Sequence, residues 1–220
     1  MTTQSPLQIA VAGAGAIGLA HIQAIAHNPR CLLSGIVDPS PNAGAVAKIH
    51  SVPLFATLDA LLAQHKPDAI ILATPNALHV PQALQCIAAG VPVLLEKPIA
   101  TTVQEAQTLV AQVEATQAKV LIGHHRAHSP IMAQAKHVVD SGQLGALVAV
   151  MGSATFFKPD SYFNDAPWRR EQGAGPILLN MIHEVHNLRM LCGDIVAVQA
   201  FQSNATRGFA VEDTVAINLR

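Results

Sequence analysis

The fold is decided by the stretch LQIAVAGAGAIG, residues 7–18. Leu7–Ala12 is a short apolar run typical of a buried parallel strand, and Gly13, Gly15 and Gly18 follow it at the start of a helical segment. In this arrangement the first glycine allows a tight turn, the second lets a pyrophosphate approach the backbone, and the third lets the helix pack on the strand. The stretch therefore predicts a dinucleotide-binding turn, with phosphate at the helix N-terminus.

An acidic residue supports this interpretation. Asp38 ends the next apolar run, about 20 residues beyond the loop, where a carboxylate accepts hydrogen bonds from a ribose diol. The same carboxylate repels the extra phosphate of NADP, and the following Pro39–Pro41 contains no Arg or Lys. NAD is therefore favoured over NADP as the cofactor. The alternative is a glycine-rich turn of an α/β protein that binds another phosphate, or no ligand.

Apolar runs alternate with helical stretches as far as residue 123, which predicts a doubly wound parallel sheet. The runs expected as strands are Leu7–Ala12, Leu32–Val37, Val52–Phe55, Ala69–Ala73, Val91–Leu95 and Lys119–Ile122. Thr102 and Glu105 have the spacing of a capping box at the start of one of the helices. Residues 1–123 are therefore predicted to form an NAD-binding Rossmann domain.

The sequence changes character after this point. A polar group at His124–His128 precedes a helix, and a further helix is expected from Pro176, a favoured first helical position. Strands are expected at Leu144–Phe157, Ile195–Gln202 and Val211–Leu219. Residues 124–220 are therefore predicted to form a smaller α/β domain with a mostly antiparallel sheet, for substrate binding and oligomerisation. This second domain is expected to be short or truncated.

Composition excludes several classes of protein. Of the 220 residues, 50% are hydrophobic and only 12% charged, so a buried core is expected and disorder is not. The formal net charge of −1 gives no strong electrostatic attraction to nucleic acid or to an anionic membrane. A small partner is therefore favoured. No signal peptide and no long apolar span are evident, so a soluble cytoplasmic protein is expected. Cys31, Cys86 and Cys192 suggest reduced, buried thiols rather than a disulfide framework.

Three later motifs extend the pattern set by the glycine loop. Ala73–His79 reads ATPNALH, Glu96–Pro98 reads EKP, and residues 173–193 read GAGPILLNMIHEVHNLRMLCG. Together with GAGAIG they resemble, over essentially the whole chain, the glucose-fructose oxidoreductase, inositol dehydrogenase and rhizopine catabolism (Gfo/Idh/MocA) family. The resemblance implies a Rossmann domain followed by an α/β domain whose open sheet often mediates oligomerisation. It also implies NAD- or NADP-dependent oxidation or reduction of a sugar, polyol or related compound.

The resemblance also assigns site residues. Lys97 matches the catalytic lysine of the family, and His183 matches the helix histidine that faces the substrate. Oxidation of an alcohol needs a group that takes the hydroxyl proton and a cation that stabilises the developing alkoxide, which suit His183 and Lys97 respectively. The expected cofactor-binding residues are Gly13, Gly15, Ala16, Ile17, Gly18, Asp38, Thr74, Pro75, Asn76, His79, Glu96 and Lys97. The expected substrate residues are Lys97, His124, Arg126, Trp168, Arg169, Asn180 and His183.

Each assignment has a structural alternative. Lys97 could be a water-exposed strand-end lysine, and Trp168 with Arg169 could pack a loop against the sheet. His124 and Arg126 could serve an interdomain structural role. No metal site is expected from the histidines, because neither CxxC nor HExxH frames them.

One departure from the family affects function more than fold. The best-known members carry an Asp four residues before the helix histidine, where this chain has Leu179. Asn180 follows, but an amide does not accept a proton at neutral pH. The leading hypothesis is an NAD-dependent dehydrogenase of a sugar, polyol or related hydroxy or keto compound. The alternatives are an NAD-bound sensing or partner-binding protein without turnover, a truncated fragment of the enzyme, and a reductase of another Rossmann class.

Overall fold

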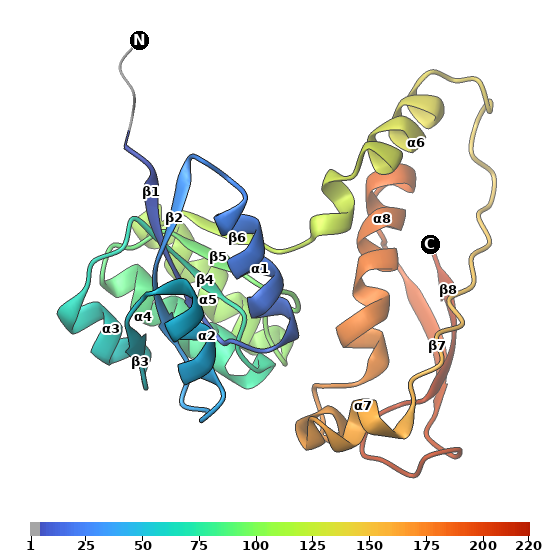
Figure 1. Ribbon diagram of the computed structural model, residues 1–220. Coiled ribbons are helices and arrows are strands. Elements are labelled where there is room, and N and C mark those ends of the chain that lie inside the picture. Colours follow the sequence, from blue (N-terminus) through green and yellow to red (C-terminus); the bar gives the residue numbers. More distant parts are fainter. Residues whose placement is uncertain (1–4) are drawn as a thin grey trace. The chain divides into compact units, whose positions relative to one another are not determined.

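The computed structural model describes residues 5–220, which divide into two compact units whose boundary in the sequence falls between Gly123 and His124. The first unit contains a six-stranded parallel sheet of order β3-β2-β1-β4-β5-β6 (Figure 1). Its strands are β1 (Leu7–Ala12), β2 (Cys31–Val37), β3 (Leu54–Phe55), β4 (Ala69–Leu72), β5 (Val93–Leu95) and β6 (Val120–Ile122). Its helices are α1 (Ala16–Ala26), α2 (Ala43–His50), α3 (Leu58–Gln64), α4 (His79–Ala88) and α5 (Val103–Thr116), with the 3₁₀ turn η1 (Asn76–Leu78). The doubly wound Rossmann sheet predicted from the sequence is thereby confirmed.

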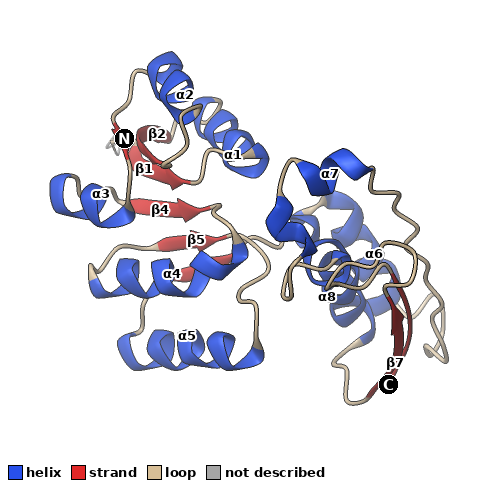
Figure 2. Cartoon of the chain, turned by 90° about the horizontal axis from the view of Figure 1, so that it is seen from below, coloured by secondary structure: helices blue, strands red, loops and turns tan. Residues whose placement is uncertain are grey.

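Helices cover both faces of this sheet (Figure 2). On one face, Ile22 and Ile25 of α1 pack with Val11 and Ile36 of the sheet. On the other face, the side chains of α3, α4 and α5 form a second core with β1, β4 and β5. Because both faces are buried, the strands consist of nearly continuous apolar runs.

The backbone ladder of the sheet continues past the strand ends and fixes the residues that follow them. The amide of Gly13 donates to Val37 O at 2.8 Å, and that of Glu96 donates to Leu72 O at 2.9 Å. The amide of Gly123 donates to the next carbonyl along this edge, Leu95 O, at 2.8 Å. The carboxyl edge, where open α/β sheets bind ligands, is therefore held in register.

The second unit is built from shorter elements. They are η2 (His125–His128), α6 (Pro130–Asp140), α7 (Asp160–Asn164), η3 (Pro167–Arg170), the π-helical turn η4 (Ile177–Met181), α8 (Ile182–Cys192), β7 (Val198–Ser203) and β8 (Thr214–Leu219). Strands β7 and β8 pair antiparallel, with Val198 opposite Leu219 and Ser203 opposite Thr214. The α/β class and the antiparallel pairing of this unit agree with the sequence prediction.

The strand predicted at Leu144–Phe157 is wrong. This segment forms no regular element, and Val148 and Met151 are 95% and 99% exposed. Alternating apolar residues make a strand only when a neighbouring strand accepts their backbone hydrogen bonds, and β7 and β8 pair only with each other in the part of the chain that the structure describes.

The predicted burial of the three cysteines holds in part. Cys86 is fully buried, and burial raises the pKa of its thiol to about 12. Cys192, expected to be buried, is exposed because it lies at the last position of α8. None of the helices described for residues 5–220 combines the length and the apolar character that crossing a membrane requires.

Candidate active site

The glycine loop between β1 and α1 has the shape that a dinucleotide requires. Gly13 adopts a φ of +91°, and a Cβ there would lie 2.4 Å from Ala73 O. A Cβ on Gly18 would lie 1.8 Å from Gly13 O, so α1 packs directly on the turn. Gly15 has no neighbouring heavy atom within 4 Å of an added Cβ, and Gly15, Ala16 and Ile17 are exposed. The open helix start therefore fits a pyrophosphate, as NAD binding requires.

Asp38 lies at the end of β2 and is tied to this loop. Its Oδ2 accepts from Ala14 N at 2.7 Å and its Oδ1 accepts from Ser40 N at 2.8 Å. Although burial raises the pKa of this carboxyl, the bonds from Ser40 and Ala14 lower it, and the net shift is downward. Asp38 is therefore ionised at neutral pH. Each oxygen keeps acceptor capacity for a ribose hydroxyl.

The loop after β4 is held by a buried histidine. His79 is 1% exposed, and its Nδ1 and Nε2 lie 2.6 Å from Pro98 O and 2.9 Å from Thr74 O. Thr74 Oγ1 donates to Gln82 at 2.6 Å, and Asn76 is buried. These bonds fix the loop of residues 74–79 at the carboxyl edge of the sheet.

Glu96 and Lys97 follow β5. Glu96 is 7% exposed, and its Oε1 lies 2.8 Å from His21 Nε2 of α1. Burial raises the pKa of Glu96. The hydrogen bond and charge of His21, together with the amide and charge of Lys97, outweigh this effect, so the net pKa is lowered. Lys97 is half-buried, and the Lys97–Pro98 peptide bond is cis. The site therefore contains a buried carboxylate directly beside the candidate lysine.

The second unit brings together four imidazole rings, two from α8 and two from the start of η2 and the residue before it. His183 of α8 is 4% exposed, with its ring centroid 4.8 Å from that of His125 and 6.0 Å from that of His124. His124 stacks on His186 at 4.3 Å. Arg126 forms an ion pair with Glu184 of α8. The predicted substrate residues His124, Arg126 and His183 thus form one polar cluster.

Trp168 and Arg169 belong to a different part of the unit. The Arg169 guanidinium lies 4.0 Å from the Tyr162 ring centroid and 5.5 Å from that of Trp168, and it donates to Tyr162 O at 2.7 Å. These contacts fix η3 against α7. They show packing against α7 rather than against the sheet, and the substrate role of Trp168 and Arg169 stays a prediction.

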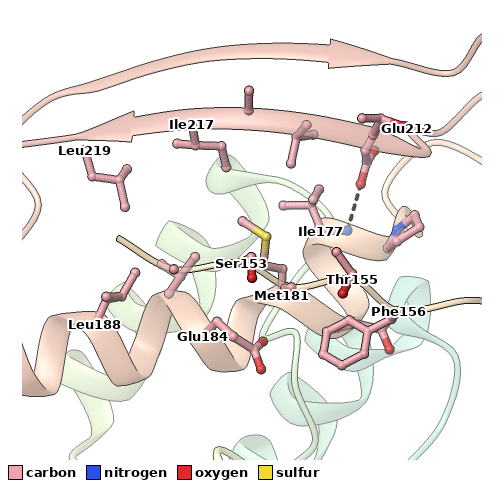
Figure 3. A pocket seen from close by; sticks show the side chains of 18 of the residues that line it. Ser153, Thr155, Phe156, Ile177, Met181, Glu184, Leu188, Glu212, Ile217 and Leu219 are labelled. Atoms are coloured by element: carbon pink, nitrogen blue, oxygen red, sulfur yellow. Dashed lines mark hydrogen bonds between the residues drawn. The ribbon is translucent and has the colours of Figure 1, made fainter. Parts of the chain in front are cut away.

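Asn180 lies beside a large groove of the second unit. The groove has a volume of about 1360 Å³ between α8, β8 and residues 147–158; Figure 3 shows Leu188 of α8 below Ile217 and Leu219 of β8. Asn180 Nδ2 is buried and makes no hydrogen bond within residues 5–220. Asn180 lines this groove, whereas His124, Arg126, Trp168, Arg169 and His183 do not.

Glu212 fixes the start of the helical segment that carries Asn180 and His183. Its carboxylate accepts from Ile177 N at 2.8 Å, as the dashed line in Figure 3 shows. A Cβ on Gly175 would lie 2.3 Å from the Glu212 carboxylate, so the glycine leaves room for this bond.

Several residues that contact the predicted site residues, His21 and His186 among them, were not themselves predicted as site residues. His21, the partner of Glu96, lies one helical turn after Gly18 on α1, which places it near the edge of the sheet. His186, the partner of His124, follows His183 by three residues on the same helix. Across residues 5–220, no group of three or more His, Cys, Asp or Glu side chains has the arrangement of a metal site.

Comparison with known proteins agrees with these features. The family described as "Oxidoreductase family, NAD-binding Rossmann fold" matches residues 7–124, and the "GFO/IDH/MocA C-terminal domain" matches residues 132–220. The chain is 26% identical to rhizopine catabolism protein MocA of Rhizobium meliloti over 84% of its own length and 57% of that protein. It is 29% identical to inositol 2-dehydrogenase of Rhodococcus erythropolis over 93% of its own length and 58% of that protein.

Solved structures give the same picture. The WlbA dehydrogenase of Bordetella pertussis, in complex with NADH and UDP-GlcNAcA, superposes with a TM-score of 0.93 at 29% identity, covering 98% of this chain and 67% of that one. GenD2 from gentamicin A biosynthesis, in complex with NAD, gives a TM-score of 0.82 at 26% identity, covering 100% of this chain and 63% of that one. The chain spans less than three fifths of the length of the two curated relatives named above. It belongs to the Gfo/Idh/MocA family of NAD-binding oxidoreductases.

Proposed function

We propose that this protein is an NAD-dependent dehydrogenase that transfers a hydride between the nicotinamide cofactor and a sugar, polyol or related hydroxy or keto compound. The observation that carries the proposal is the carboxyl edge of the first unit. There the open turn at Gly15 follows β1, the ionised Asp38 follows β2 and the Glu96–Lys97 pair follows β5 of the same sheet. Offering inositols, sugars and sugar acids with NAD or NADP, while following nicotinamide absorbance, tests it. Tight NAD binding without turnover of any compound would contradict it.

The chain's own residues supply binding and proton chemistry. The glycine loop and Asp38 hold the cofactor. Its nicotinamide half is proposed to lie against the loop formed by Thr74, Pro75, Asn76 and His79. His183 takes the proton of the substrate hydroxyl, and the Lys97 ammonium stabilises the developing alkoxide. The nicotinamide ring, when bound, accepts the hydride.

The role of His183 gives a separate prediction. Replacing His183 with Asn is expected to lower kcat by about 10²-fold to 10³-fold, because the proton acceptor is lost, while the Kd for NAD stays unchanged. The exposed His137 of α6, changed to Asn, is the matched control. Steady-state kinetics and NAD titration measure the two effects. A kcat that survives the loss of His183 would remove it from the mechanism.

Asp38 is proposed to set the preference for NAD. Changing Asp38 to Ser removes both the ribose acceptor and the charge that repels the extra phosphate of NADP, so the ratio of NAD to NADP affinity is expected to fall at least about tenfold. Titrating both cofactors measures this ratio, with the exposed Asp59 changed to Ser as a control. An unchanged ratio of NAD to NADP affinity would show that a group other than Asp38 distinguishes the ribose hydroxyl from the ribose phosphate.

A second candidate function rests on Leu179. This buried apolar side chain occupies the position where the best-known family members carry an Asp. The corresponding hypothesis is an NAD-bound protein that senses a ligand or partner without turnover. The turnover assay distinguishes the two functions directly.

We further propose that the protein works in the cytoplasm and as a homo-oligomer joined through the β7–β8 sheet, with a small molecule rather than nucleic acid or membrane as its partner. The support is the near-neutral net charge of −1 and the family resemblance. Light scattering measures the molar mass in solution, and a monomer at micromolar concentration would contradict the assembly.

A further inference from the structure

The residue before Lys97 is anchored to a helix far away in the sequence. Glu96 Oε1 lies 2.8 Å from His21 Nε2, and Glu96 Oε2 accepts from the amide of Lys97 itself at 3.2 Å. Gly123 leaves room for this carboxylate, since a Cβ there would lie 2.9 Å from Glu96 Oε1. The backbone on the amino side of Lys97 is thus tied to α1 through one carboxylate.

The residue after Lys97 is anchored by a second histidine. His79 Nδ1 lies 2.6 Å from Pro98 O, and its Nε2 lies 2.9 Å from Thr74 O. Both partners are carbonyl oxygens, which only accept, so a neutral ring can donate to one of them at a time. Burial, the largest influence, lowers the pKa of His79, so the ring is neutral at neutral pH. We place its one proton on Nδ1, where the contact to Pro98 O is the shorter of the two.

We propose that His21 and His79 are positioning residues that fix the backbone on either side of Lys97 and thereby place its ammonium group where it stabilises the developing alkoxide. The inference rests on the function proposed above, in which Lys97 acts on the substrate. A lysine side chain has four rotatable carbon–carbon bonds, so its reach depends on where its backbone is held. A misplacement of about 1 Å can cost about 10²-fold in rate.

The chemistry of the two bonds provides matched pairs of variants. The amide nitrogen of Gln reaches the position of His Nε2, whereas that of Asn reaches only the position of Nδ1. Therefore His21→Gln keeps the bond to Glu96 and His21→Asn loses it. At position 79 the order is reversed, because His79→Asn keeps the bond to Pro98 and His79→Gln keeps only the bond to Thr74.

The expected result is a crossed pattern in kcat. His21→Asn and His79→Gln are expected to lower kcat about tenfold to 10²-fold further than His21→Gln and His79→Asn do, with the KM for NAD similar within each pair. A side chain needed only for folding would not respond to Asn and Gln in opposite order at the two positions. Equal losses within each pair, or the reverse order, would overturn the proposal.

A second measurement does not depend on turnover. Acetic anhydride acylates free amines, so the labelling rate of Lys97, relative to the exposed Lys48 in the same chain, reports on its placement by mass spectrometry. This ratio is expected to change at least threefold in His21→Asn and His79→Gln, and less in their partners. A wild-type chain without turnover would contradict the proposed function, while the labelling still decides the positioning. The His21 side chain is 22% exposed, so substitutions there are tolerated more readily than at the buried position 79. The comparison of His21→Asn with His21→Gln therefore decides the outcome even if neither His79 variant folds.

Discussion

Replacing Lys97 with alanine is expected to abolish turnover while leaving NAD binding largely intact. The substitution removes the cation that stabilises the developing alkoxide, so kcat should fall at least about 10³-fold. The glycine loop and Asp38, which hold the cofactor, are not touched by the change. Steady-state kinetics and calorimetric titration with NAD measure the two quantities.

The control for this experiment is another lysine of the same unit. Lys119 is exposed and directly precedes β6, so Lys119→Ala removes a like charge without touching the Glu96–Lys97 pair. Its kcat and its Kd for NAD should match those of the wild type. If Lys97→Ala weakened NAD binding as much as turnover, Lys97 would be a cofactor ligand and its catalytic assignment would be wrong.

The same substitution at two glycines of one loop should have very different effects on the free energy of unfolding. Gly18→Ala places a Cβ 1.8 Å from Gly13 O, a backbone atom that cannot move without opening the turn. The free energy of unfolding should drop by about 3 kcal/mol, and NAD binding should be lost with the turn. Gly15→Ala meets no atom within 4 Å and has a φ of −73°, which suits alanine.

Gly15→Ala should therefore separate binding from stability. Losing glycine at the N-cap of α1 costs below about 1 kcal/mol, whereas the new methyl group blocks the approach of the pyrophosphate and should raise the Kd for NAD at least about tenfold. Urea unfolding and NAD titration measure both effects. A Gly15→Ala protein that binds NAD as the wild type does would place the pyrophosphate elsewhere.

The first unit could be predicted because its signals are local. β1 begins and ends where expected, at Leu7 and Ala12, since an apolar run bounded by a glycine loop carries the strand and its end together. Thr102 and Glu105 form the capping box that their spacing predicted, with Thr102 Oγ1 accepting from Glu105 N at 3.2 Å. Such signals depend on a few neighbouring residues, so the sequence alone is enough to recognise them.

Other features depend on partners that spacing does not reveal. The run Leu144–Phe157 alternates like a strand but has no strand beside it, so its pattern alone did not determine its structure. His21 and Glu96 are separated by several strands and helices, and their contact follows only from the sheet order that brings the ends of β1 and β5 to one edge. The EKP motif indicated Glu96 and Lys97, whereas His21, which anchors Glu96, could be identified only from the structure.

The central claim is that hydride passes between a bound polyol or sugar and NAD. The most direct measurement incubates the protein and NAD with substrates deuterated at their alcohol carbons, beginning with myo-inositol, and analyses the nicotinamide by mass spectrometry. The account predicts reduced nicotinamide that carries one deuterium per turnover, and none with Lys97→Ala. Full NAD binding with no deuterium transferred from any inositol, sugar or sugar acid, in this chain and in any longer form of it, would contradict the account.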